Sequence, residues 1–250
     1  MKRYRSLAAW ATAGIGLLLV FLVPTGTPAR SALAQTNGPV CGPMDVAFII
    51  DDTGSMGGAL SNVNSELASI LGDIATASGN DYRLALVSFK DNITVRDNFA
   101  ANNAAVVGPH ITALFPFGGS GEPEASDEAL NTVVNTLPSA GRPQNIDFTP
   151  AYRAGALKLA IVVTDARPGG FDDTFTAGAD DVHAHTVATQ AAALGIKVSG
   201  IHVPGGFMAT TAAVLMDYAS TTGGLYRLTA PDGTGAGQAI KDIIAACGSG

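Results

Sequence analysis

Basic side chains are scarce in this sequence. Its 250 residues include 14 Lys and Arg against 21 Asp and Glu, and charged residues make up only 14% of the chain. Proteins that hold nucleic acid do so with clustered Lys and Arg, so this composition argues against nucleic acid as a partner. The surplus of carboxylates favours cations as partners instead.

The chain also lacks the signatures of disordered and fibrous proteins. Hydrophobic residues make up 47% of it, and its 30 glycines and 13 prolines follow no fixed period. This composition fits one ordinary globular domain with a short additional apolar segment.

Only the N-terminus carries a long hydrophobic run. Three basic residues precede an uncharged apolar run at residues 7–23, and the small-residue pattern Ala32-Leu33-Ala34 follows. This order is typical of a secretory signal peptide, so we expect cleavage after Ala34. The alternative is an uncleaved membrane anchor, because the run is at the short limit for crossing a bilayer of about 30 Å.

In both cases the rest of the chain leaves the cytosol. We therefore expect a secreted or extracytoplasmic protein, in the periplasm or on the cell surface, with membrane contact only if the N-terminal segment is retained. Cleavage removes four basic residues and no acidic one, which leaves 10 basic and 21 acidic residues, a net charge of 10 − 21 = −11.

Cysteine is nearly absent, since the chain contains only Cys41 and Cys247. Both belong to the expected mature protein and lie near its two ends, and the termini of compact domains often lie close together. In an oxidising compartment we expect one disulfide between them. Two separate thiols are the alternative.

Apolar runs alternate with helical spacing along the rest of the chain. Strands alternating with helices predict a doubly wound α/β fold, with a mostly parallel sheet and helices on both faces. A polar stretch at residues 92–99 alternates as an antiparallel edge strand does. The other strands are expected at residues 44–50, 82–89, 157–164, 196–203 and 225–228, and helices at 60–76, 101–114, 124–137, 179–194, 208–221 and 235–246.

Two of the expected buried strands run directly into an aspartate, the first into Asp51 and the second into Asp165. Functional groups of an open α/β sheet gather at the carboxyl ends of its strands. Two carboxylates brought together there repel each other unless a cation lies between them. The sequence therefore predicts a divalent cation at this edge of the sheet.

The loop after the first strand reads DDTGSMGG and supplies further oxygen ligands. Asp51, Thr53 and Ser55 stand at every second position, without His or Cys. Such hard ligands suit magnesium, calcium or manganese rather than zinc. Taken alone, the same loop fits a helix cap that needs no metal.

Four stretches of this sequence resemble the von Willebrand factor type A (VWA) domain family. DVAFIIDDTGSM resembles the opening of the domain, whose metal-ion-dependent adhesion site (MIDAS) uses D-x-S/T-x-S. PFGGSGEPEASDEAL resembles its Pro-Glu loop, KLAIVVTDA its second metal-aspartate strand and GIKVSGIHV the following strand. The resemblance covers roughly residues 44–246 and implies a Rossmann-like VWA fold.

The resemblance also implies a ligand set for the cation, with magnesium favoured over calcium and manganese. Ser120 and Glu122 are alternatives for the middle ligand because they lie in the same loop, and Gly121 stands where relatives often have an aspartate, which argues against a second metal site. The implied ligands are Asp51, Thr53 and Ser55 from the first loop, Glu124 from the middle loop and Asp165 from the last.

The family further implies that one coordination position stays open for an acidic group of a partner. We expect this partner to be a protein or extracellular-matrix ligand that presents Asp or Glu. The expected organisation is a signal peptide (1–34), an N-terminal extension (35–43), a VWA-like domain (44–247) and a C-terminal tail (248–250). A structural or sensing domain, in which the metal only braces the fold, is the alternative.

An enzymatic reading depends on Asp52-Thr53-Gly54, the motif of aspartic proteases. That chemistry needs two such aspartates sharing a proton, whereas this sequence has one D-T-G and an α/β pattern. No P-loop, Ser-His-Asp order or G-x-G-x-x-G follows the first strand, so we expect no enzymatic activity. His183 and His185, two positions apart on an expected helix, should diverge rather than share a zinc ion.

Overall fold

The computed structural model describes residues 41–119 and 121–249. Within them, six strands form one sheet in the order β3-β2-β1-β4-β5-β6. The strands are β1 (Met44–Asp51), β2 (Tyr82–Phe89), β3 (Ile93–Ala101), β4 (Leu157–Thr164), β5 (Ile196–His202) and β6 (Tyr226–Leu228). Every strand pair is parallel except β2 with β3, so the predicted antiparallel edge strand is confirmed.

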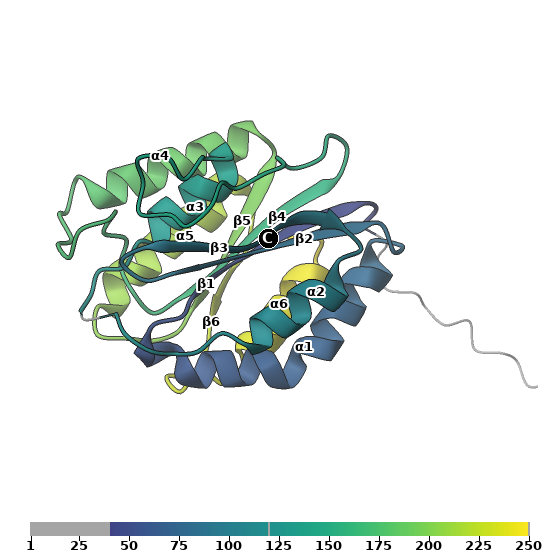
Figure 1. Ribbon diagram of the computed structural model, residues 1–250. Helices are drawn as coiled ribbons and strands as arrows, with labels where there is room; N and C mark the ends of the chain where they lie inside the picture. The colour runs from purple at the N-terminus through teal and green to yellow at the C-terminus, as the bar shows by residue number, and fades with distance from the viewer. Residues whose placement is uncertain (1–40, 120, 250) are drawn as a thin grey trace, which may run out of the picture. The chain divides into compact units, whose positions relative to one another are not determined.

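Helices cover both faces of the sheet (Figure 1), as the alternating pattern predicted. A short 3-10 turn, η1, precedes the first helix, and α1, α2 and α6 lie on one face while α3, α4 and α5 lie on the other. Their bounds are η1 (Gly54–Met56), α1 (Gly57–Ala77), α2 (Ala104–Thr112), α3 (Ser126–Asn135), α4 (Asp180–Ala193), α5 (Met208–Thr222) and α6 (Ala236–Ala245). The predicted fold class is therefore correct.

Strand β1 is the centre of the molecule because it pairs with both β2 and β4 and all eight of its residues are buried. Its side chains alternate between two hydrophobic cores. Phe48 and Ile50 join the core beneath α1 and α6, whereas Ala47 and Ile49 join the core beneath α3 and α4. A strand buried on both faces favours apolar residues, which explains the apolar run from Val46 to Ile50. The exception is Asp45, which is buried where Arg83 and Arg153 pair with it.

Helix α3 begins later than its periodicity predicted. The expected start was residue 124, but the helix begins at Ser126. The backbone N–H of Glu124 donates to the carbonyl of Arg167 at 3.0 Å, and Glu124 forms an isolated parallel bridge with Pro168. Glu124 therefore lies in an extended segment beside the chain that follows β4, which brings its side chain to the end of the sheet.

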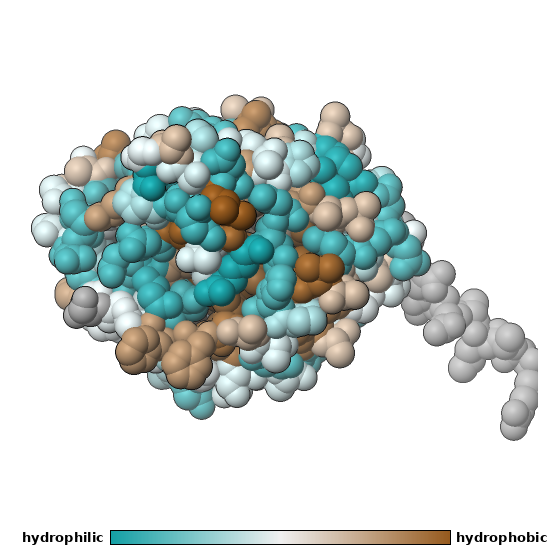
Figure 2. Space-filling model, in the orientation of Figure 1, coloured by the Kyte–Doolittle hydropathy of each residue, from teal (hydrophilic) through white to brown (hydrophobic). Residues whose placement is uncertain are grey.

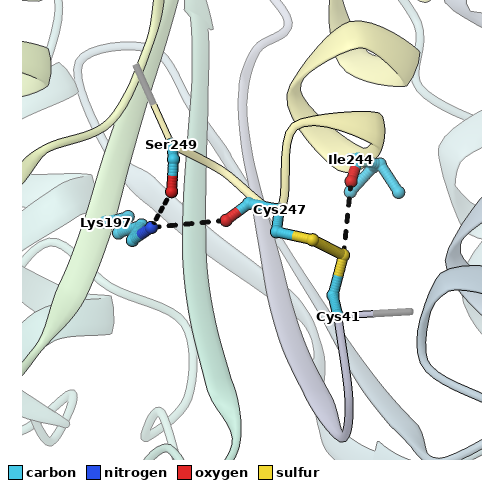
Figure 3. Close-up of a disulfide and its surroundings, with 5 residues drawn as sticks. All are labelled: Cys41, Lys197, Ile244, Cys247 and Ser249. Carbon is cyan, nitrogen blue, oxygen red and sulfur yellow. Dashed lines mark hydrogen bonds between the residues drawn. A yellow bond between two sulfur atoms is a disulfide. The ribbon is translucent and has the colours of Figure 1, made fainter. Parts of the chain in front are cut away.

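Cys41 and Cys247 form a disulfide, and Figure 3 shows the bond beside the end of α6. Their Cα atoms are 5.6 Å apart although the residues are 206 positions apart in sequence. Lys197 of β5 donates to the Cys247 carbonyl at 3.4 Å and also to the Ser249 hydroxyl. The disulfide therefore lies at the end of the sheet where β1 begins, and Asp51 lies at the opposite end of this strand.

The expected signal peptide (1–34) and the residues up to 40 lie outside the described residues, so the predicted domain boundaries remain predictions. Among the residues that are described, no helix combines the length and apolar character that crossing a bilayer requires.

Reduction of the disulfide should lower the melting temperature without unfolding the domain at room temperature, because two hydrophobic cores remain in place. Native disulfides stabilise by about 2 to 4 kcal/mol, and long closed loops lie at the upper end in the entropic model. Thermal melts with and without a thiol reductant measure the effect, and the Cys41→Ser/Cys247→Ser variant, insensitive to the reductant, is the control. An equal melting temperature in all four samples would contradict the stabilising role.

Candidate metal centre

The carboxyl ends of β1 and β4 border a cavity of about 280 Å³. Loop residues after both strands and the glycine-rich segment before α3 line it. Four of the five predicted ligands are among the lining residues: Thr53, Ser55, Glu124 and Asp165. The fifth, Asp51, is completely buried and is hydrogen-bonded to Thr53. The structure thus brings the sequence-predicted ligands to one place.

Both oxygens of the Asp51 carboxylate accept hydrogen bonds. Oδ1 accepts from the Thr53 backbone N–H at 2.9 Å and from the Thr53 hydroxyl at 2.6 Å, and Oδ2 accepts from the Thr164 hydroxyl at 2.7 Å. Thr164 was not singled out from the sequence, although it directly precedes Asp165. The Thr53 hydroxyl proton points to Asp51, so the Thr53 hydroxyl oxygen keeps lone pairs for another partner.

Ser55 links the two aspartates. Its hydroxyl lies 3.1 Å from the Thr53 hydroxyl and also hydrogen-bonds the Asp165 carboxylate. The side chains of Asp51, Thr53, Ser55 and Asp165 therefore form a continuous chain of oxygens at the base of the cavity.

Glu124 carries a buried oxygen with no partner. The residue is 4% exposed, and its Oε2 atom has no hydrogen bond among the described residues. An unpaired buried carboxylate oxygen is costly, so such an atom calls for a ligand. A cation in the cavity would satisfy it, and the surrounding donor set of carboxylate and hydroxyl oxygens fits a hard divalent ion.

Glu122, the alternative to Glu124, is already engaged. One of its oxygens accepts from the Arg167 backbone N–H at 2.8 Å, and the other accepts from the Arg167 guanidinium at 3.0 Å. Glu124 is therefore the better middle ligand of the two. The other alternative, Ser120, lies outside the described residues.

Burial raises the pKa of Asp51 to about 7, and the negative charge of Asp165 adds to the effect. Burial likewise raises the pKa of Glu124 to about 8, with further contributions from Asp51, Asp91 and Asp165. The pKa of Asp165 is raised by burial as well. All three shifts mean that negative charge is unfavourable here without a compensating cation.

Hydroxyl oxygens of Thr53 and Ser55 lie beside the carboxylates of the candidate metal centre. Among the described residues, no group of three or more His, Cys, Asp or Glu side chains is placed to hold a metal ion. The donor atoms gathered at this position are carboxylate and hydroxyl oxygens, which suit a hard cation better than zinc.

Asp52 of the D-T-G motif is committed elsewhere. Its carboxylate forms ion pairs with Lys90 at 2.6 Å and Arg96 at 2.9 Å. An aspartic protease needs a carboxylate that shares a proton with a second one, and two cations on Asp52 oppose that arrangement.

The histidines also find separate partners. His183 contacts Asp127 of α3 at 2.6 Å, whereas His185 contacts Asp217 of α5 at 2.9 Å, so the two rings diverge as predicted. A third histidine, His110, contacts Asp97 at 2.8 Å.

The chain belongs to the von Willebrand factor type A domain family, because the family model matches residues 45–241. Among solved structures it is similar to the conserved hypothetical protein BatB from Bacteroides thetaiotaomicron, at 15% identity and a TM-score of 0.55, over 82% of this chain and 98% of that chain. It is also similar to the von Willebrand factor domain of a type V pilus tip protein from Porphyromonas gingivalis, at 13% identity and a TM-score of 0.55, over 82% and 94% of the two chains.

A third similar structure is proximal thread matrix protein 1 of the mussel byssus with a zinc-occupied MIDAS motif. It shares 16% identity at a TM-score of 0.54, over 84% of this chain and 47% of that chain. At such identities the likeness shows the fold alone. No curated protein matches this sequence at a significant level.

The Asp51→Asn variant should gain stability relative to the unchanged protein as pH rises from 5 to 8 in EDTA. The pKa of Asp51 is raised from 3.8 to about 7 in the folded state, so the folded protein binds more protons than the unfolded chain in this window and loses stability as pH rises. The full shift corresponds to at most about 4 kcal/mol. Urea melts of both proteins across this range test the difference, and parallel stability curves would contradict the raised pKa of the buried Asp51 carboxylate.

Gly119→Ala should weaken divalent-ion affinity by roughly 10- to 100-fold, the usual effect of disturbing the groups behind a metal ligand. A Cβ atom there would lie 2.6 Å from Glu124 Oε1 and 2.6 Å from Thr53 Cγ2, and the residue has a φ of +73°. Gly121→Ala is the matched control, since a Cβ atom there meets nothing within 4 Å. Equal affinities of the two variants in calorimetry would show that Gly119 does not shape the site.

Proposed function

We propose that this chain is an exported binding module that captures a carboxylate of a protein partner through a divalent cation. A MIDAS-type site holds the ion, with magnesium favoured and calcium or manganese as alternatives. The observation that carries this proposal is Glu124, which borders a cavity lined by Thr53, Ser55 and Asp165 and whose buried Oε2 atom has no hydrogen-bond partner in the described part of the chain. Asp51, which is completely buried beside Thr53, completes the proposed ligand set.

The position of these groups favours a partner over a purely internal role. Thr53, Ser55 and Asp165 line an open cavity at the end of the sheet, so an ion held there would face the solvent. A hard cation with an open position prefers an anionic oxygen. Without the ion, the same carboxylates would repel an acidic partner.

Two of the similar structures come from proteins of adhesive assemblies and support a protein-binding role. One comes from a pilus tip protein and another from a byssus matrix protein whose MIDAS motif holds zinc. For this chain the hydroxyl and carboxylate donors favour a harder ion. The disulfide supports export, because such bonds persist in oxidising compartments.

A structural or sensing domain is the second candidate. The deep burial of Asp51 and its hydrogen bonds to Thr53 and Thr164 favour it, since an ion near such a carboxylate would stabilise the fold even without a partner. In neither case do we propose an enzymatic activity.

Asp51→Ala and Asp165→Ala should each abolish binding of one magnesium, calcium or manganese ion, because the site depends on charge from both aspartates. Calorimetry on the purified domain measures this. Asp173→Ala, which removes an exposed carboxylate from the loop after β4, is the control and should bind the ion normally. Unchanged affinity in both site variants would refute the ligand assignment.

Partner capture is tested by pull-down from the exported fraction with and without EDTA, using the unchanged protein and Thr53→Ala. Chelation should remove nearly all capture, and Thr53→Ala should impair it while the metal-free protein stays folded, because the sheet and both cores are untouched. Capture that survives both changes would leave the metal with a structural role only.

A further inference from the structure

Exposed aromatic rings concentrate around the candidate metal centre. Phe115 and Phe117 are 72% and 71% exposed, and Phe207 is 48% exposed. Every other phenylalanine in the described part of the chain is buried or half-buried. The three exposed ones lie in the two segments that border the cavity, one before α3 and one before α5. Single exposed apolar residues are ordinary, but a group beside one cavity marks an interaction surface.

The first segment is held firmly against the ligand loop. The Phe117 backbone N–H donates to the Asp52 carbonyl at 3.2 Å, and the Gly54 N–H donates to the Gly118 carbonyl at 3.0 Å. Pro116 packs over Gly57, where a Cβ atom would lie 3.6 Å from the proline ring. The proline thus faces inward while its two neighbours are exposed.

The rings of Phe115 and Phe117 stack on each other with centroids 6.3 Å apart and an angle of 30°. Figure 2 shows hydrophobic side chains gathered at the lower left of the molecule, where Figure 1 places the segment after α2. We call these two rings the first wall. They directly precede Gly118 and Gly119, which line the cavity, and the backbone contacts of this segment fix it relative to Thr53.

Phe207 forms the second wall. It lines the cavity, and the guanidinium of Arg167 lies 3.4 Å from its ring centroid. Arg167 is in turn held by both oxygens of Glu122. The ring is therefore supported by a cation that is itself fixed, so this wall is also arranged before any partner arrives.

We propose that these two walls form an apolar rim that selects the residues beside the partner's carboxylate. The occupant is a protein segment in which an Asp or Glu is flanked by aromatic or large aliphatic side chains. This inference rests on the proposed function, because the metal-bound carboxylate places the flanking residues against Phe115, Phe117 and Phe207. Rigid aromatic groups that are already in position cost little entropy on binding and are typical anchors of protein interfaces.

A lipid surface is the competing occupant for exposed phenylalanines. The charge of the chain argues against a lipid surface. The chain has 21 acidic and 14 basic residues, and the carboxylates of Glu122, Glu124 and Asp165 line the cavity. Peripheral membrane binding normally combines apolar side chains with Lys and Arg that attract anionic lipids. The charge pattern therefore favours a cation-bridged carboxylate as the central contact.

The test compares two peptides, Gly-Gly-Phe-Glu-Phe-Gly-Gly and Gly-Gly-Ser-Glu-Ser-Gly-Gly, binding to the full chain in saturating magnesium. The unchanged protein should bind the Phe peptide about tenfold or more tightly than the Ser peptide, because only the former buries apolar surface on the rim. The Phe115→Ser/Phe117→Ser variant should lose this preference but keep its affinity for magnesium and for the Ser peptide. Leu194→Ser, at an exposed leucine after α4, is the matched control and should keep the preference.

An equal affinity for both peptides in the unchanged protein would contradict the proposal that the rim selects the flanking residues. A preference for the Phe peptide that persists in the double variant would contradict it as well. Absence of binding by both peptides to protein loaded with magnesium would overturn it too. Peptide binding that is unaffected by EDTA contradicts the proposed function, whereas metal-dependent binding without preference contradicts the rim alone. Binding of phosphatidylcholine vesicles by the unchanged protein but not by the double variant, without a peptide preference, would assign the rim to a membrane instead.

Discussion

A completely buried carboxylate ends β1, a strand whose eight residues are all buried. Asp51 closes β1, which is covered on both faces and paired on both edges. Its negative charge must be compensated locally, so Thr53 and Thr164 both direct hydroxyl protons to it. Those two hydrogen bonds orient the Thr53 oxygen for the cavity and connect β1 to β4. The candidate metal centre is thus organised around a carboxylate whose negative charge is destabilised by its burial in the fold.

The sheet order places the remaining groups. Because β1 and β4 are parallel neighbours with Ile50 opposite Val163, the residues that follow them emerge side by side. The segment before α3 joins them through backbone contacts, from Gly118 to the ligand loop and from Glu124 to the chain after β4. A site assembled in this way needs no long-range adjustment of side chains, since the backbone already brings three loops together.

Much of this arrangement could be predicted from sequence, because apolar runs specify buried strands and two of them end in aspartate. The choice between Glu122 and Glu124 as the middle ligand could not be predicted from sequence. Only the tertiary contact with Arg167 shows that both oxygens of Glu122 already have hydrogen-bond partners. The extended conformation of Glu124 was also missed. Helical periodicity runs through this residue, and the Arg167 carbonyl that accepts its backbone N–H is distant in sequence. Phe115 and Phe117 carried no signal either, as an aromatic residue in a sequence resembles core until its neighbours are known.

The disulfide has a mechanical consequence. It joins the two ends of the domain at the edge where β1 starts, while the candidate site lies where β1 finishes. Tension applied between the chain before Cys41 and the chain after Cys247 would pass through the sulfur–sulfur bond and leave the sheet unstretched. Tension between a ligand at the site and either end would instead run along β1, so its ladders with β2 and β4 would be sheared together rather than opened one hydrogen bond at a time. Because β1 is paired on both sides, a load along this strand is shared by two ladders.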